Sequence, residues 1–162
     1  MKEQISYSRA QTLWLVVLRL LIGWHFLYEG LVKFFNSSWT SYHYLMDSQG
    51  VFADLFYALA DNPALLSVAN FLNVYGLILI GLGLILGCFS KISSIGGIIL
   101  LVFYCLSHPP FIGAEYMMPT EGSYLWVDKN LIEIGAMMVL IYFPTSRIIG
   151  LDRFIFKKIN RK

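Results

Sequence analysis

Charged residues are scarce in this chain of 162 residues, where they make up 14% of the sequence against about a quarter in soluble domains. Apolar residues, in contrast, reach 57%, and the mean hydropathy is +0.65. The net charge is only +2, which excludes a surface that follows nucleic-acid phosphates. A chain this apolar does not stay disordered either. These shortages indicate an integral membrane protein whose first partner is the lipid bilayer.

Residues that bind metals or carry redox chemistry are also few. Cys88 and Cys105 are the only cysteines, they form no C-x-x-C pair, and we expect them at different depths, which excludes a dithiol relay and a disulfide. His25, His43 and His108 could be axial haem ligands, but no two of them lie four residues apart as in metal-binding helices. No phosphate-binding glycine motif is present. We therefore predict no metal, haem or nucleotide cofactor, and we interpret His43 as a membrane-interface residue.

Two long stretches carry no charge, one between Asp61 and Lys91 and one between Lys91 and Glu115. Each contains a continuous apolar run, which favours a helix over the alternating apolar and polar residues of a β-barrel strand. About 20 helical residues are enough to cross a bilayer. Two further apolar runs are interrupted by polar residues. We expect membrane-spanning helices over residues 13–35, 71–89, 93–107 and 125–143. The predicted fold is all-α, an integral membrane four-helix bundle with short interfacial helices that forms a single domain over residues 1–162.

The basic residues are distributed very unevenly along the chain. Nine of the twelve lie in the N-terminal segment, at Lys91 or in the tail 147–162, whereas the loops 36–70 and 109–124 contain acidic residues and no basic ones. Loops rich in lysine and arginine stay in the cytoplasm. The sequence therefore predicts a multi-pass protein with both termini cytoplasmic and both long loops outside.

Two shorter segments have the spacing of amphipathic helices. Apolar residues recur at helical intervals over residues 51–60, which we expect to lie flat on the outer surface. In the tail 147–162, apolar and basic residues alternate with the same period. We expect this tail to form a basic amphipathic helix on the anionic inner leaflet.

The first expected span contains four ionisable residues, Arg19, His25, Glu29 and Lys33. At about 100° per residue all four lie on one face, within a third of the helix circumference. An ionisable group at membrane depth costs at least about 2.5–3.5 kcal/mol unless it is paired or hydrated. We therefore expect this face to point into the bundle.

The other spans supply polar partners for this face in the outer half of the membrane. The candidate pocket residues are Arg19, His25, Glu29, Lys33, Tyr104, His108, Lys129, Asn130 and Glu133. We expect Glu29 and Glu133 to face each other, with His25 and Lys33 or Arg19 compensating their charge. A few polar groups among aromatic residues are typical of a small-molecule pocket. The alternative is structural, because Glu29–Lys33 and Lys129–Glu133 could be plain i,i+4 ion pairs.

Several short motifs resemble the DoxX/DoxD family of membrane proteins. They are Arg19…Gly23…Glu29-Gly30…Lys33-Phe34, the glycine-rich run 76–83, and Val127-Asp128-Lys129-Asn130-Leu131-Ile132-Glu133. The resemblance covers most of the chain and implies a four-helix bundle in the cytoplasmic (inner) membrane. One branch of the family is the small subunit of a thiosulfate:quinone oxidoreductase. The matching positions are Arg19, Glu29, Lys33, Asn130 and Glu133, whereas Asn73 stands where relatives often have an acidic residue.

The resemblance implies a membrane subunit of a quinone-linked oxidoreductase that acts on a small, sulfur-containing substrate. The pocket would then hold the substrate or a quinone headgroup, with Glu29 and Glu133 as proton acceptors and Lys33 and Lys129 attracting anions. The implied partners are a soluble or membrane-bound redox subunit, or further copies of this chain. The alternative is a non-catalytic membrane scaffold or small-molecule permeation protein, and the sequence assigns no catalytic residue.

Overall fold

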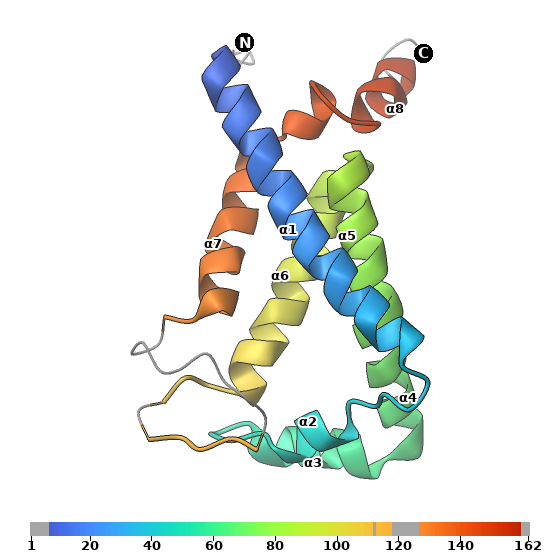
Figure 1. Ribbon diagram of the computed structural model, residues 1–162, viewed down its shortest axis with the longest axis vertical. Helices are drawn as coiled ribbons and strands as arrows, with labels where there is room; N and C mark the ends of the chain where they lie inside the picture. The colour runs from blue at the N-terminus through green and yellow to red at the C-terminus, as the bar shows by residue number, and fades with distance from the viewer. Residues whose placement is uncertain (1–6, 112, 118–126, 160–162) are drawn as a thin grey trace.

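The computed structural model describes residues 7–111, 113–117 and 127–159, and within these ranges it contains helices and loops but no strand (Figure 1). The main helices are α1 (Arg9–Phe35), α4 (Pro63–Phe71), α5 (Leu77–Leu86), α6 (Ser90–Ser107) and α7 (Lys129–Tyr142). The short elements are α2 (Tyr42–Met46), α3 (Ala53–Asp61), the 3-10 turn η2 (Thr145–Arg147) and α8 (Asp152–Ile159). A π-helical turn, η1 (Leu72–Gly76), joins α4 to α5 without a break.

Three helices of the described chain are long and apolar enough to cross a membrane. They are α1, the continuous unit Pro63–Leu86, and α6. The helix that contains the predicted span 71–89 begins earlier, at Pro63, as the sequence Asp61-Asn62-Pro63 predicts. Asn62 caps it by accepting the N–H groups of Ala64 and Leu65, and Pro63 occupies its first turn. It ends at Gly87, whose φ of 62° is left-handed and suits glycine. The predicted class, an all-α membrane bundle, is confirmed.

The fourth helix, α7, begins later than the predicted residue 125. The Asp128 carboxylate accepts the N–H of Leu131 and caps the helix, so that the first helical residue is Lys129. Its 14 residues extend about 21 Å, less than the roughly 30 Å of a bilayer core. α7 packs against α6 and α1 and completes the bundle, while the number of membrane crossings stays a prediction.

The helices pack around one apolar core inside the bundle. Its buried members come from α1, α5, α6 and α7 and include Phe26, Leu84, Leu101 and Met137. α1 and α5 cross very closely, because a Cβ on Gly81 would lie 2.5 Å from the backbone nitrogen of Leu27. Only glycine fits at this crossing.

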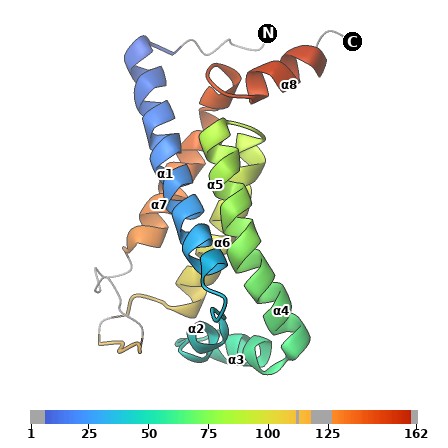
Figure 2. The ribbon, with the colours of Figure 1, turned by 45° about the vertical axis from the view of Figure 1, so that its right-hand side comes forward.

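A small helical layer covers one end of the bundle (Figures 1 and 2). α2 and α3 lie across this end and pack on each other through a second apolar cluster formed by Leu45, Phe56 and Ala60. α3 corresponds to the amphipathic segment expected over residues 51–60. Both chain termini and α8 lie at the opposite end.

Candidate functional site

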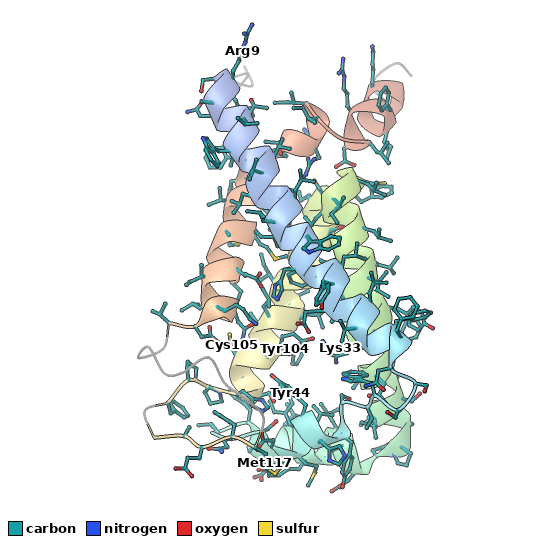
Figure 3. All side chains as sticks on the ribbon, viewed as in Figure 1. Arg9, Lys33, Tyr44, Tyr104, Cys105 and Met117 are labelled. Carbon is teal, nitrogen blue, oxygen red and sulfur yellow. The ribbon has the colours of Figure 1, made fainter. Side chains whose placement is uncertain are left out.

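A cavity of about 760 Å³ lies between the bundle and the α2–α3 layer. Its size is within the range of small-molecule sites. Figure 3 shows Lys33, Tyr104 and Tyr44 in this region, on α1, α6 and α2. The predicted pocket residues that line it are His25, Glu29, Lys33, Tyr104, His108, Lys129 and Asn130.

His25 and Glu133 form the closest polar contact between α1 and α7. The Nδ1 atom of His25 lies 2.6 Å from Oε1 of Glu133. The Glu133 side chain is largely buried, and its second oxygen, Oε2, has no hydrogen-bond partner in the described structure. A carboxylate that accepts from one ring nitrogen orients the imidazole and leaves the other nitrogen for a ligand. The contact therefore presents Nε2 of His25 as the polar atom for a cavity occupant.

Glu29 and Lys33 form an i,i+4 ion pair on the same face of α1, with 3.1 Å between Nζ and Oε2. The Glu29 side chain is 46% exposed, while Lys33 is largely buried and its Nζ lies 5.7 Å from the ring centre of Trp39. Lys129 is close enough to act electrostatically on both His25 and Glu29. Glu29 and Glu133 thus each have a basic partner at the cavity.

The π-helical turn brings Asn73 into the cavity wall. Its side-chain amide donates to the Ala69 carbonyl at 3.0 Å, and its Oδ1 accepts from the Tyr104 hydroxyl at 2.6 Å. π turns are rare and concentrate at functional sites. Asn73 therefore faces the cavity as a neutral amide held by two hydrogen bonds.

An aromatic stack closes the cavity on the side of the α2–α3 layer. The His108 ring stacks on Tyr44 with 4.0 Å between centroids and lies 4.7 Å from Tyr116. Its Nδ1 is 2.9 Å from the Ser107 hydroxyl, and its Nε2 is 3.6 Å from Asp47. Burial lowers the pKa of His108 and outweighs the opposite effect of the Asp47 carboxylate. The same burial raises the pKa of Tyr44.

Three hydrogen bonds attach the loop after α6 to the segment between α2 and α3. The Met117 N–H donates to both carboxylate oxygens of Asp47, at 3.1 and 3.0 Å. The Gln49 side-chain amide donates to the Glu115 carbonyl at 2.6 Å. Tyr116, which lines the cavity, lies between these two contacts in the sequence.

The prediction that Arg19 lines the pocket is wrong. Arg19 is only 3% exposed and lies toward the opposite end of the bundle, where Nη2 donates to the Ile149 carbonyl at 2.9 Å and Nη1 contacts the Thr145 hydroxyl at 3.4 Å. Arg19 shares the helix face of His25, but six residues of helix separate the two by about 9 Å along the axis. The helix face predicted for Arg19 is correct, but its predicted depth in the bundle is wrong.

The expected charge compensation of the two glutamates is found for two of the three cations. Glu133 contacts His25 and Glu29 contacts Lys33, whereas Arg19 serves neither carboxylate. That Glu29 and Glu133 face each other stays a prediction. Glu133 itself is absent from the cavity lining and contributes through His25. His43, expected at the membrane interface, lines the cavity instead. The described residues contain no cluster of three histidine, cysteine or acidic side chains suited to a metal ion.

Sequence reasoning missed several lining residues, chiefly Trp39, Thr40, Tyr44, Asn73 and Tyr116. Most of them lie in the loops that the structure folds over the bundle. The density of aromatic residues around position 42 was a signal, but the sequence does not specify where a loop folds.

The fold and the site together define an α-helical membrane protein with a polar, aromatic-lined cavity at one end of its bundle. The family model of DoxX matches residues 14–109, more than half of the chain. The chain therefore belongs to the DoxX family. The match covers α1 to the end of α6, and α7 with Glu133 lies beyond it. No curated protein and no solved structure matches the chain.

Proposed function

We propose that the chain is the membrane subunit of a quinone-linked oxidoreductase and that its cavity binds the quinone headgroup. The observation that carries the proposal is the 2.6 Å contact between His25 and Glu133, which holds an imidazole at a cavity whose lining includes several aromatic rings and side-chain amides. A quinone headgroup is a flat, uncharged ring with two carbonyl oxygens. Aromatic walls suit its faces, and one imidazole nitrogen suits a carbonyl oxygen.

The charges in the cavity favour an uncharged occupant over an anion. Lys33 is neutralised by Glu29 at 3.1 Å, and His25 by Glu133. An anionic substrate would have to compete with these carboxylates for the same cations. This supports a quinone as the occupant of this chain, with the small sulfur-containing substrate on the redox partner subunit.

The reaction at this site is the reduction of the quinone to a quinol. The ring takes up two electrons, and each carbonyl oxygen takes up one proton. The electrons come from the sulfur compound that the partner subunit oxidises. The proton on Nε2 of His25 is transferred to one carbonyl oxygen, while Glu133 holds the imidazole through Nδ1 and stabilises its charged form. The second proton comes from water at the open side of the cavity, where Glu29 is half exposed.

The test is quinone binding by the purified chain. Quinone should be recovered when the protein is extracted with organic solvent, and a short-chain quinone should quench the fluorescence of Trp39, a lining residue. Trp39→Phe controls for quenching of the other tryptophans. We expect His25→Gln to weaken binding about tenfold or more, since it removes one charge-assisted hydrogen bond. Glu133→Gln removes the carboxylate that contacts His25 and should also weaken quinone binding. Its matched control is Asp61→Asn, an exposed carboxylate outside the cavity. A wild-type chain that binds no quinone would instead favour a scaffold or permeation protein.

A further inference from the structure

The C-terminal segment is anchored at the end of the bundle that lies opposite the cavity. The Asp152 backbone N–H donates to the Gly87 carbonyl at 2.8 Å. Its carboxylate accepts the backbone N–H groups of Phe89 at 2.7 Å and Ser90 at 3.2 Å. Asp152 thus caps the start of α6 from a distant part of the chain. These contacts hold the first turn of α8 against the turn between α5 and α6.

Asp152 also determines which face of α8 is turned toward the bundle. It is only 3% exposed, so its side of the helix faces the protein. Ile155 follows three residues later and is half buried, and the sequence places two further apolar residues, Phe156 and Ile159, four and seven positions after Asp152. At about 100° per residue these positions share the face of Asp152, whereas Phe154 lies about 160° away. Apart from Asp152, the residue types at these positions on one face of α8 are therefore apolar.

α8 and its apolar face extend past the edge of the helix bundle. Figure 2 shows α8 running across the end of the bundle and away from α5. At the same level the bundle exposes large apolar side chains, with Leu86 50%, Phe89 51% and Ile92 67% exposed. Such side chains on the outside of a membrane bundle contact lipid. The apolar face of α8 therefore continues a lipid-contacting surface.

The charged residues of α8 other than Asp152 are all basic. Arg153 and Lys157 are exposed, and they lie about 100° and 140° from Asp152 on one flank of α8. The only acidic residue in the sequence 147–162 is Asp152, and its carboxylate is used in the cap of α6. The exposed flank of α8 thus carries positive charge only. This charge complements anionic phospholipid headgroups.

We propose that α8 is an interfacial helix that binds anionic phospholipids, with its apolar face at the boundary of the acyl chains and with Arg153 and Lys157 on the phosphate groups. The proposal is independent of what the cavity binds. It makes a specific distinction between two neighbouring apolar residues. Ile155 should contact lipid, whereas Phe154, on the opposite side of the helix, should contact water.

The test uses the full chain in nanodiscs of phosphatidylcholine, alone or mixed with phosphatidylglycerol. Spin labels are placed on Ile155→Cys or Phe154→Cys in a chain that also carries Cys88→Ser and Cys105→Ser. At position 155 we expect collisions with oxygen to exceed those with a water-soluble nickel complex, and at position 154 the reverse. Phosphatidylglycerol should move the label at 155 deeper. Arg153→Gln with Lys157→Gln should abolish that shift, while Arg9→Gln, a basic residue at the same end but outside α8, should leave it unchanged.

Two results would overturn the proposal. Equal access of the nickel complex to positions 154 and 155 in both bilayers would show that α8 does not lie on lipid. A label at 155 that stays at the same depth with and without phosphatidylglycerol would show that the basic flank does not bind anionic headgroups.

Discussion

His25 on α1 and Glu133 on α7 are joined by a 2.6 Å contact between residues 108 positions apart in the sequence. The contact links the first and last main helices of the bundle beside the cavity. Either residue alone would be an ionisable group without compensation at membrane depth. Their pairing therefore stabilises the fold and orients the His25 ring at the cavity, where Nε2 is the atom proposed to meet a polar occupant.

A double-mutant cycle can measure this coupling. His25→Gln and Glu133→Gln each remove the charge and keep a polar side chain of similar length. We expect each single variant to unfold at a lower temperature in detergent, and the double variant to cost less than the sum of the two. The expected coupling is about 1–3 kcal/mol, typical of residues that share one buried contact. Strictly additive effects would mean that the two residues do not interact.

The Glu29–Lys33 pair should behave differently, because Glu29 is half exposed. Exposed i,i+4 pairs contribute only about 0.3–0.5 kcal/mol. We therefore expect Glu29→Gln to leave the unfolding temperature almost unchanged and to slow quinone reduction through loss of a proton-exchanging group. Asp54→Asn, on α3, is the matched control for the reduction rate. A large loss of stability in Glu29→Gln would show that this pair is structural.

Much of the bundle could be predicted from the sequence, because lipid imposes simple rules. Charge-free stretches indicated the helices of the second and third spans, and the helical angle placed His25, Glu29 and Lys33 on one inward face. The depth of a residue along a helix was harder to predict. Arg19 shares that face, but it lies toward the opposite end of the bundle, where its guanidinium donates to Thr145 and Ile149.

The remaining part of the site depends on contacts that periodicity does not encode. His43 and Tyr44 reach the cavity because α2 folds across the end of the bundle. Asn73 faces Tyr104 because one turn of the helix is a π turn, and no residue type in the segment 72–76 signals such a turn. Tertiary packing determines both features.

The Asn73–Tyr104 contact leads to a prediction about the π turn. Asn73→Ala removes two hydrogen bonds. The Tyr104 hydroxyl loses its acceptor, whereas the Ala69 carbonyl keeps the backbone N–H of Leu72. We expect a loss of about 1–3 kcal/mol in the free energy of unfolding, the usual cost of unpaired buried polar groups. Tyr104→Phe removes only one of the two hydrogen bonds and should cost less. Thermal unfolding of the two variants, measured side by side, tests which of them loses more stability. Equal losses, or a larger loss in Tyr104→Phe, would contradict the prediction.

His108 should make the stability of the protein depend on pH. Burial holds its pKa below the ordinary value of 6.5 despite the nearby Asp47. In the unfolded chain His108 takes up a proton near pH 6.5, whereas the folded protein keeps it neutral to a lower pH. The unfolded state then binds more protons in this range, so stability falls as the pH drops below about 6.5.

Melting temperatures measured from neutral pH down to about pH 5.5 test this expectation. His108→Gln should flatten the profile, and His43→Gln, a histidine that lines the same cavity, should not. A His108→Gln profile with the slope of the wild type would show that another group is responsible.

The last prediction concerns the orientation of the bundle in the membrane. The uneven distribution of basic residues predicts that the α2–α3 layer and the cavity face outside, and that α8 faces the cytoplasm.

Cysteine labelling tests this orientation. Ser48, although it lies in the outer loop, is a poor probe because its side chain is buried against Ser107. Val51 is 92% exposed in the same layer, and Lys157 is exposed on α8. In a chain with Cys88→Ser and Cys105→Ser, a membrane-impermeant maleimide should label Val51→Cys in intact cells. The same reagent should label Lys157→Cys only after lysis. The opposite pattern would place the cavity on the cytoplasmic side, and labelling of both sites in intact cells would mean that the two ends of the bundle do not lie on opposite sides of the membrane.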